Sequence, residues 1–418
     1  MPLPKLVVHH ARNGIVSLNV LTAALRADAR TAGLEIVFAK DEDALVAAIT
    51  PGAIVAWSFY SPESAEMAKM LGSVRERAPG ALHVAGGVHA TAEPLDTLNS
   101  GFDLVALGEG ERTIVDLVLA VAAGADPLTV RGLGRLEKGE LKTSGRSEPV
   151  ELDAHPAFNL PDRKFNAIEI TRGCIYACAF CQTPFMFKAR FRHRSIDSVR
   201  EHVRIMRRER LRYVRFVTPT SLSYGSETTE PNLAAVEALL EACREEIGPE
   251  GKLFFGTFPS EVRPEHVTPE ALQLLRRWVD NDNLVIGGQS GSQRVLDQTR
   301  RDHSVEDVVR ASRLAIEHGF VPNVDFLFGL PNEDGTDHEA TVTLMQTLSE
   351  LGARVHSHTF MPLPGTPLRD APAGEVGEPV RRELARLEAH GRAYGQWRAQ
   401  VVTAERLAQR RVRTTSRG

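Results

Sequence analysis

Three of the four cysteines of this chain lie in one short segment, EITRGCIYACAFCQTP (169–184). Cys174, Cys178 and Cys181 have the spacing C-x3-C-x2-C, and cysteine thiolates are strong metal ligands. A structural zinc site normally has four ligands, arranged as two separated pairs. The remaining cysteine, Cys243, stands among apolar neighbours in AAVEALLEACREEIG, a pattern that favours a small buried residue.

Three thiols without a fourth suit a cubane iron–sulfur cluster, in which the protein holds three irons and leaves the fourth open. The open iron would give a small molecule a place to bind and to receive an electron. Zinc is the alternative, with its fourth ligand supplied from elsewhere in the chain. The elements around this segment must therefore hold three thiols beside a space that a small molecule can enter.

The first part of the chain alternates short β-like runs with helical patterns, which predicts an α/β domain with a doubly wound, Rossmann-like parallel sheet. Ligands of such sheets bind at the carboxyl ends of the strands, where glycines let the backbone come close. The expected strands are 5–10, 34–39, 53–59, 81–87 and 102–108.

A second strand–helix series begins at residue 166 and contains six units rather than eight. A closed eight-unit barrel takes about 250 residues, so the span 166–370 predicts a partial (β/α)6 TIM-type barrel. The three cysteines follow the end of its first strand, at the rim where such barrels do chemistry. The expected strands are 166–171, 213–218, 252–257, 284–288, 322–328 and 355–361.

These patterns predict four parts along the chain. Residues 1–128 form the Rossmann-like domain, and 129–165 form a linker that includes a hairpin turning at Lys138-Gly139. The partial barrel occupies 166–370. The charged pattern over 376–411 predicts that 371–418 form a C-terminal helical extension.

Composition is that of a soluble globular protein, with 42% hydrophobic and 25% charged residues. The net charge of −4 argues against a surface built as a whole for nucleic acid. We find no apolar leader pattern and no long uncharged apolar run, so we expect no membrane association. The low cysteine count fits a reducing cytoplasm.

The stretch KARFRHRSIDSVREHVRIMRRERLRYVRF (188–216) is strongly basic. It could steer an anionic substrate, or RNA, towards the cysteines. A solvated helix face is the favoured interpretation, because Asp197, Glu201 and Glu209 supply acidic partners nearby.

The cysteine spacing, preceded by TRG and with Phe180 before the last cysteine, resembles the radical S-adenosylmethionine (SAM) superfamily. The resemblance extends over 166–370. It implies a 4Fe–4S cluster whose open iron binds SAM through its amino and carboxylate groups. It also implies reductive cleavage of SAM to a 5′-deoxyadenosyl radical that abstracts hydrogen, with an electron donor such as flavodoxin or ferredoxin as partner. The segments that carry it are RFVTPTSLSYG (215–225), GTFPSEVRPE (256–265), LVIGGQSGSQRVLDQTRRDHS (284–304), VDFLFGLPNED (324–334) and MPLPGTPL (361–368).

The same resemblance implies positions for the contacts to SAM. The expected contacts are Thr218 and Pro219 at the amino-acid end, Ser260 and Glu261 at the ribose and sulfonium, and Gly288, Gln289 and Ser290 at the adenine or ribose. Two departures stand out: many relatives have an acidic residue in place of Gln289, and a glycine-glycine-acid run in place of TPT. The alternatives are a helix cap for Gln289–Ser292 and a plain turn for GLPNEDG.

The segment HVAGGVHATAEPLDTLNSGFDLVALGEGERTIVDL (83–117) resembles the cobalamin-binding domain that precedes the barrel in cobalamin-dependent, class B type radical SAM enzymes. The resemblance implies cobalamin at the carboxyl edge of the first sheet. The expected contacts are Ser17, Asn19, Ser58, Phe59, Tyr60, Gly86, Gly87, His89, Ala90, Gly108, Glu109 and Gly110. Core packing is the alternative for the aromatic residues.

Many such domains carry Asp-x-His-x-x-Gly after the first strand, with the histidine as lower cobalt ligand. Here the loop reads HHARNG (9–14), and matching Gly14 to the motif glycine puts Ala11 at the ligand position. We therefore expect a cobalt without a histidine ligand on its lower face. Direct ligation by His9 or His10 is the alternative, and we expect His89 to line the corrin edge or cap its loop.

Taken together, the resemblance implies a methyltransferase that acts on an unactivated carbon of a small molecule or peptide. One SAM would methylate cobalamin and a second would yield the radical. The alternatives are a cobalamin-assisted cyclase or rearrangement enzyme without methyl transfer, an RNA-modifying enzyme, and a sensor without turnover. The sequence assigns no catalytic acid or base.

Overall fold

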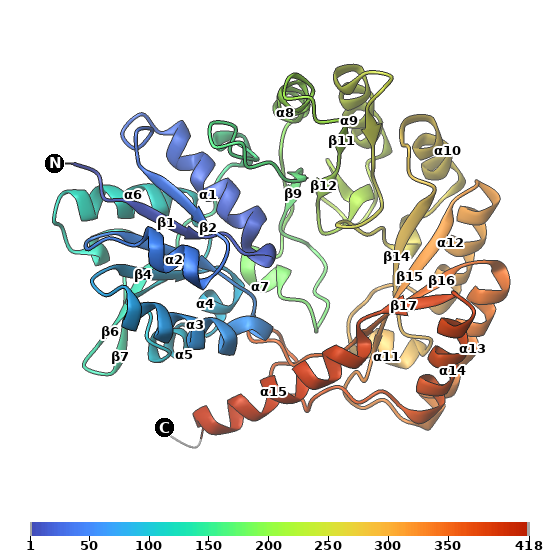
Figure 1. Ribbon diagram of the computed structural model, residues 1–418. Coiled ribbons are helices and arrows are strands. Elements are labelled where there is room, and N and C mark those ends of the chain that lie inside the picture. The colour runs from blue at the N-terminus through green and yellow to red at the C-terminus, as the bar shows by residue number, and fades with distance from the viewer. Residues whose placement is uncertain (1, 416–418) are drawn as a thin grey trace. The chain divides into compact units, whose positions relative to one another are not determined.

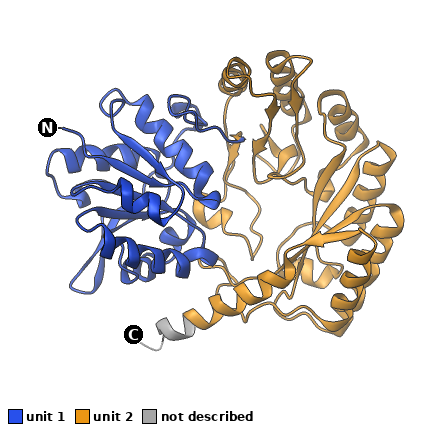
Figure 2. Ribbon diagram, in the orientation of Figure 1, with its two compact units in different colours: residues 1–167 blue, residues 168–418 orange. Residues whose placement is uncertain are grey.

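The structure is a computed structural model that describes residues 2–415, with side chains described to residue 410. It divides into two compact units, residues 1–167 and residues 168–418 (Figure 2). Among the described helices, none has the length and apolar content needed to span a bilayer.

Within the described residues, unit 1 is built on a seven-stranded sheet with the order β2-β1-β3-β4-β5-β6-β7 (Figure 1). Pairing is parallel from β2 to β5 and antiparallel from β5 to β7. The order of the first five strands is that of a doubly wound sheet, as predicted. The strands are β1 (Leu6–His9), β2 (Ile36–Ala39), β3 (Ile54–Ser58), β4 (Leu82–Gly86), β5 (Leu104–Ala106), β6 (Leu133–Glu137) and β7 (Glu140–Thr143).

Helices cover both faces of this sheet, because successive residues of a strand face opposite sides. Leu6 and Val8 of β1 pack in one cluster with α1 and α6. Val7 packs in a second cluster with α2, α3, α4 and α5. The helices are α1 (Ile15–Ala27), α2 (Glu42–Ala48), α3 (Ser64–Arg77), α4 (Val88–Ala92), α5 (Pro94–Asn99) and α6 (Glu111–Ala122).

Two features of unit 1 differ from the sequence-based expectation. The short helices α4 and α5 were not predicted, because neither is long enough to show a helical period. The hairpin was predicted correctly, with Lys138 and Gly139 at the turn between β6 and β7. However, it extends the sheet beside β5 instead of standing in a separate linker.

Trp57 of β3 lies in the second cluster and meets two buried histidines. Its indole Nε1 donates a hydrogen bond to Nδ1 of His83, 3.2 Å away, and its ring lies 4.7 Å from that of His9. Because the indole N–H is a donor, Nδ1 of His83 must accept and carries no proton. Burial, followed by the charge of Arg75, lowers the pKa of His83 from 6.5 to about 4.

This pairing predicts that unit 1 loses stability in acid. His83 binds a proton more readily in the unfolded chain, so stability falls as the pH drops from 6.5 towards 4. His83→Gln keeps an acceptor for the indole but does not titrate. As the pH falls from about 7 to about 4, the free energy of unfolding, measured with urea, should therefore decrease by about 2 kcal/mol more in the wild-type protein than in the variant. Parallel pH profiles for the two proteins would contradict this account.

Unit 2 is the predicted partial barrel. Parallel pairs join β8 to β12 and β11 to β13, and a parallel bridge joins Val262 to Ile286 of β14. The parallel run β14-β15-β16-β17 completes the wall (Figure 1). The strands are β8 (Ile168–Glu169), β9 (Thr171–Arg172), β10 (Arg192–His193), β11 (Tyr213–Val214), β12 (Phe216–Val217), β13 (Lys252–Leu253), β14 (Asn283–Gln289), β15 (Val321–Phe328), β16 (Arg354–Thr359) and β17 (Ala393–Gly395).

Most helices of unit 2 begin after a Ser, Thr, Asn or Asp residue, the residue types that favour helix N-termini. Six cap side chains accept hydrogen bonds from the first turn of α8 to α13: Ser195, Asn232, Thr268, Ser292, Ser304 and Asp334. The helices are α7 (Thr183–Phe187), α8 (Ile196–Arg208), α9 (Leu233–Ile247), α10 (Pro269–Trp278), α11 (Gln293–Gln298), α12 (Val305–Glu317), α13 (Gly335–Leu351), α14 (Glu378–Ala389) and α15 (Trp397–Thr415).

The C-terminal extension is not entirely helical. The pattern over 376–411 predicted helix throughout, but β17 interrupts it and pairs in parallel with β16. The three-residue segment Ala393–Gly395 gains backbone hydrogen bonds there, which a propensity pattern over the charged residues around it does not reveal. As a result, α15 begins beside the end of β16.

The basic stretch includes α8, where Arg200 and Arg204 are paired with acidic residues. Arg204 contacts Glu201 of the same helix and Glu246 of α9, and Arg200 contacts Glu245. Most of these acidic partners therefore come from α9. The sequence-based interpretation named Asp197, Glu201 and Glu209, which lie in or directly after α8. These pairs support the interpretation of a solvated helix face.

Candidate functional site

A cavity of about 340 Å³ lies in unit 2 beside the three cysteines. Its walls come mainly from the segments that follow the barrel strands, as expected for the carboxyl edge of a barrel. The lining residues are Cys174, Tyr176, Cys178, Phe180, Cys181, Thr183, Pro219, Thr220, Glu261, Arg263, Gln289, Arg301, Asp325, Leu327, His358, Thr359, Phe360, Met361, Leu363 and Gln400.

The cysteine loop brings its three thiols to this one cavity. The backbone N–H of Cys181 donates to the carbonyl oxygen of Cys178 at 3.0 Å, which turns the loop back on itself. Sγ of Cys181 accepts the N–H of Thr183 at 3.4 Å, and Sγ of Cys178 lies 3.5 Å from Nη1 of Arg301. The structure therefore places Cys174, Cys178 and Cys181 together, as the spacing predicted.

Two of these thiols, Cys174 and Cys181, are harder to ionise than a free cysteine. Burial raises the pKa of Cys174 from 9 to about 12, with the neighbouring Cys178 and Cys181 acting in the same direction. Burial also raises the pKa of Cys181. A metal cluster supplies positive charge that favours ionisation, and three soft sulfur donors on one wall fit a 4Fe–4S cluster with one iron facing the cavity.

A guanidinium network supports the wall behind the thiols. Nη2 of Arg301 donates to the carbonyl oxygen of Gly287 at 2.7 Å, and Nη1 lies 4.0 Å from the Glu261 carboxylate. Arg263 donates to the carbonyl oxygen of Arg301, and its guanidinium lies 3.5 Å from the centre of the Tyr176 ring. These buried arginines place positive charge beside the acidic and sulfur-rich wall.

The residues expected to contact SAM fall into two groups. Pro219, Glu261 and Gln289 line the cavity beside the cysteines. Thr218, Ser260 and Ser290 are buried and do not line it. Their hydroxyls bond locally: Thr218 to the carbonyl oxygen of Thr220 at 3.1 Å, Ser260 to that of Thr257 at 3.4 Å, and Ser290 to the N–H of Ser292 at 3.2 Å. Gly288 is packed against Val324.

Gln289 ends β14 in an unusual backbone conformation. Its φ is +69°, and the pairing with β15 shifts register between Gly287 and Gln289. A positive φ at a residue other than glycine is strained, and such strain persists where the surroundings hold the residue in place. Three residues later, Ser292 caps α11 by accepting the N–H of Val295. The helix-cap alternative is therefore confirmed for Ser292, while contact of Gln289 with SAM stays a prediction.

The segment GLPNEDG forms a turn and the start of α13. Asn332 has a φ of +66°, and Asp334 caps the helix in a capping box with Asp337. Glu333 accepts the N–H of Gly329 at 3.0 Å, and burial raises its pKa to about 7. The turn alternative is confirmed.

In unit 1 the expected cobalamin contacts lie on segments after β1, β3, β4 and β5. Ser17 and Tyr60 are exposed and Ser58 is half-buried. Phe59 is only 3% exposed and stacks on Phe102, so its aromatic ring belongs to the core.

The histidines of this edge already have partners. Nε2 of His10 lies 2.8 Å from Oδ1 of Asn19, which is itself buried. His89 contacts Ser61 through Nδ1 at 3.1 Å and Asp96 through Nε2 at 3.2 Å. His9 is buried against Trp57. His89 thus links the segment after β3 to α5, and its expected place at the corrin edge stays a prediction.

The glycines of the edge allow close packing of loops. A Cβ at Gly87, where φ is +89°, would lie 3.0 Å from Oγ of Ser58. A Cβ at Gly110 would lie 2.9 Å from Cδ2 of Leu21. Gly86 and Gly108 are half-buried beside them, whereas Ala90 and Glu109 are buried, and Glu109 accepts the N–H of Val150 at 3.1 Å.

Several cavity residues were not predicted from the sequence. Arg263 and Arg301 lie in loops, where no periodicity indicates which way a side chain points. Asp325 and His358 come from neighbouring strands, and Gln400 comes from α15. One signal was available: HSH at 356–358 puts two histidines on one face of a predicted strand.

Comparison with known proteins relates the barrel to a family. Residues 168–345 match the model of the Radical SAM superfamily. The match covers the cysteine loop and the strands from β8 to β15. This region of the chain is therefore similar to the radical SAM superfamily, a similarity that implies a 4Fe–4S cluster and SAM as cofactors.

Two relatives share part of the sequence. An uncharacterized methyltransferase of Pyrococcus horikoshii is 26% identical over 68% of this chain and 61% of its own length. A tRNA-2-methylthio-N(6)-dimethylallyladenosine synthase of Aeromonas salmonicida is 26% identical over 53% of this chain and 45% of its own. The chain thus spans about half of the length of the curated relatives it matches.

Two solved structures share the fold over most of the chain. The radical SAM methyltransferase TsrM of Kitasatospora setae, with cobalamin and a 4Fe–4S cluster bound, has a TM-score of 0.67 at 18% identity. The match covers 89% of this chain and 78% of TsrM. The cobalamin-dependent radical SAM enzyme OxsB has a TM-score of 0.65 at 16% identity, covering 82% of this chain and 52% of OxsB. At these identities the similarity shows a shared fold.

The glycine before the first cysteine offers a test of the loop. Gly173 has a φ of +83°, and a Cβ there would lie 2.2 Å from the carbonyl oxygen of Arg190. Gly173→Ala should cost on the order of 2 kcal/mol locally and displace Cys174. After anaerobic reconstitution, this variant should hold much less iron and sulfide per chain than the wild type.

Gly124→Ala is the matched control for this variant. Gly124 also has a positive φ, +65°, but no atom would lie within 4 Å of its Cβ. It should reconstitute like the wild type. Equal cluster content in the two variants would show that the backbone at Gly173 does not position the cysteines.

Proposed function

We propose that this chain is a cobalamin-dependent radical SAM enzyme that transfers a methyl group to an unactivated carbon. The observation that carries the proposal is the convergence of Cys174, Cys178 and Cys181 on one cavity wall. The cavity lies at the carboxyl edge of the barrel, so a substrate can reach the wall. The proposal also rests on the match of residues 168–345 to the radical SAM superfamily and on the doubly wound sheet of unit 1.

The chain's own residues would hold the reagents. The three thiolates would bind three irons of the cluster, and Arg301 beside Cys178 would offset their negative charge. Glu261 and Gln289 lie on the same cavity and offer a carboxylate and an amide to the polar groups of SAM. When bound, the reduced cluster and SAM supply a 5′-deoxyadenosyl radical, and cobalamin supplies a methyl group. Tyr176, Leu327 and Phe360 would exclude water around these reagents.

Three observations support cobalamin in unit 1. The sheet has the doubly wound order, in which ligands bind at the carboxyl edge. That edge carries exposed polar and apolar side chains, including Val16, Ser17 and Tyr60, which suit a large macrocycle. TsrM and OxsB, which share the fold, are both cobalamin enzymes by name.

The lower face of cobalt would have no histidine ligand. His10 and His89 are engaged with Asn19, Ser61 and Asp96, and His9 is buried against Trp57. The loop after β1 presents Ala11 where the family motif has its ligand. Spectra of the bound cofactor should therefore lack the signature of imidazole ligation.

Substrate and partners follow from this chemistry. We propose a small molecule or peptide as substrate and a flavodoxin or ferredoxin as electron donor. A cluster that must be reduced suits a reducing compartment, the cytoplasm. Arg200 and Arg204 of α8 are paired with acidic residues, which supports a substrate other than RNA.

The two half-reactions can be tested without knowing the substrate. Protein purified anaerobically with cobalamin is incubated with SAM and dithionite, and the nucleoside products are quantified. The wild type should form S-adenosylhomocysteine, from methyl transfer to cobalamin, and 5′-deoxyadenosine, from the cluster. Cys178→Ala should lose 5′-deoxyadenosine by at least about 100-fold, because the cluster carries the electron, and it should keep S-adenosylhomocysteine.

Cys243→Ala is the control for this experiment. Cys243 is fully buried in α9, away from the cavity lining, so its variant should form both products. Formation of 5′-deoxyadenosine without S-adenosylhomocysteine would favour a cobalamin-assisted cyclisation or rearrangement. Absence of 5′-deoxyadenosine from cluster-loaded wild type would contradict the radical assignment.

A further inference from the structure

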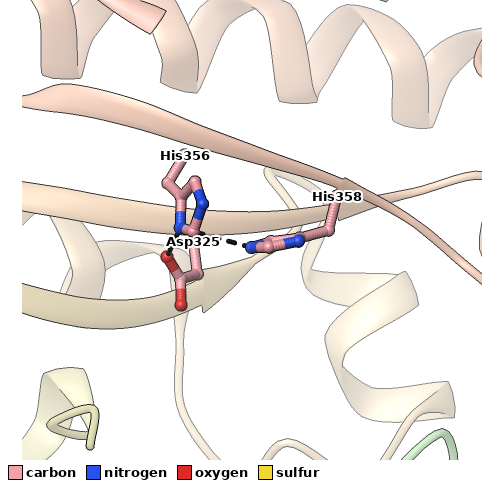
Figure 3. Close-up of side chains that lie close together, drawn as sticks. All are labelled: Asp325, His356 and His358. Atoms are coloured by element: carbon pink, nitrogen blue, oxygen red, sulfur yellow. Dashed lines mark hydrogen bonds and ion pairs between the residues drawn. The ribbon is translucent and has the colours of Figure 1, made fainter. Parts of the chain in front are cut away.

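In addition to the three cysteines, unit 2 contains a second group of side chains that can bind a metal ion. Asp325 of β15 stands opposite His356 in the parallel pairing of β15 with β16, and His358 follows on the same face of β16. Figure 3 shows the three side chains pointing toward one another. Their ligand atoms all lie within 4.8 Å of one another.

The close contacts inside this group cannot all be hydrogen bonds. Nδ1 of His356 lies 2.7 Å from Oδ1 of Asp325 and 3.2 Å from Nε2 of His358. Nδ1 takes part in both contacts but can carry only one proton. If it donates to Asp325, it has no lone pair for an N–H of His358. If it accepts from His358, its lone pair faces the carboxylate. A cation would satisfy all three atoms at once.

No permanent cation neutralises the carboxylate. Among the described residues, Asp325 forms an ion pair with His356, and no lysine or arginine is paired with Asp325. The Asp325 side chain is only 16% exposed, and His356 is 22% exposed. Glu261 on the same cavity does have Arg301 nearby, 4.0 Å away. A half-buried carboxylate beside two imidazoles therefore favours binding of a positive ion.

We propose that Asp325, His356 and His358 bind one divalent first-row metal ion, Fe²⁺ in particular. Two ligands that each lie about 2.1 Å from an ion and are 2.7 to 3.2 Å apart subtend about 80° to 100° at that ion. Such angles suit six-coordinate geometry better than the tetrahedral geometry of zinc. Two histidines and one carboxylate on one face are the ligand set of mononuclear iron sites with open positions.

The open positions would face the cavity, because Asp325 and His358 both line it. Under the proposed function, an oxygen or nitrogen donor of the substrate would occupy them. The ion would then hold the substrate in the cavity that also contains the cysteines. The metal site itself depends only on the three side chains, whereas the substrate's role rests on the proposed function.

Neighbouring side chains would hold the two imidazoles in place. The ring of Tyr394 stacks on His356, with centres 4.5 Å apart and planes at 15°. Gln400 lies 3.4 Å from Nδ1 of His358 and accepts the N–H of Thr359 at 2.8 Å. With the ion on Nε2, Nδ1 of His358 carries the proton and becomes a donor. The Gln400 oxygen would have to accept this N–H in place of the N–H of Thr359, so metal binding must outweigh the loss of that hydrogen bond.

Binding of Mn²⁺ tests this site without interference from cluster iron or cobalamin cobalt. The full chain is reconstituted anaerobically with its cluster, treated with a chelator, and titrated with Mn²⁺ while free Mn²⁺ is measured by electron paramagnetic resonance. The wild type should bind one ion per chain. Asp325→Asn and His358→Gln should each weaken binding by at least about 100-fold, because each removes a direct ligand.

His390→Gln is the matched control, because His390 is exposed at the end of α14 and bonds only within its helix. It should bind Mn²⁺ like the wild type. Unchanged cluster absorption in every variant shows that the barrel remains folded. No binding to cluster-loaded wild type, or equal binding by the Asp325 and His358 variants, would overturn the proposal. Loss of SAM cleavage with retained Mn²⁺ binding would instead contradict the proposed function alone.

Discussion

Three sulfur atoms on one partly buried wall are the constraint on which the barrel depends. Burial and the neighbouring sulfurs raise the pKa values of Cys174 and Cys181, and a bound metal would offset this cost by stabilising the thiolates. The surroundings of the wall follow from this requirement. Gly173 lets the chain turn into the loop, and Arg301 approaches the sulfur of Cys178.

Both units of the chain use the same structural rule. Parallel strands bury their apolar residues and place the segments that follow them at one edge, where polar groups gather. In unit 2 this rule brings together residues far apart in sequence, such as Cys174, Glu261 and His358, around one cavity. In unit 1 it gathers the segments after β1, β3, β4 and β5, where His10 and His89 form hydrogen bonds within the protein.

The fold could be predicted well from the sequence because buried parallel strands are continuous apolar runs. The failures have physical causes. The strand β17 has only three residues and forms by pairing with β16, and α4 and α5 are too short for a repeated helical pattern to appear in the sequence. The cysteines were identified because their ligand spacing is local. Asp325, His358 and Gln400 were not, because tertiary pairing alone brings them together. Phe59 lies in the core although its position suggested the rim.

The central claim is that three thiolates leave one iron open to the cavity, where SAM binds. Electron paramagnetic resonance of the reduced cluster, recorded with and without SAM carrying an isotopically labelled amino nitrogen, tests it most directly. The account predicts a change in the spectrum on adding SAM and a magnetic coupling between the cluster and the label. A spectrum that SAM leaves unchanged, or protein that holds zinc in place of iron, would contradict it.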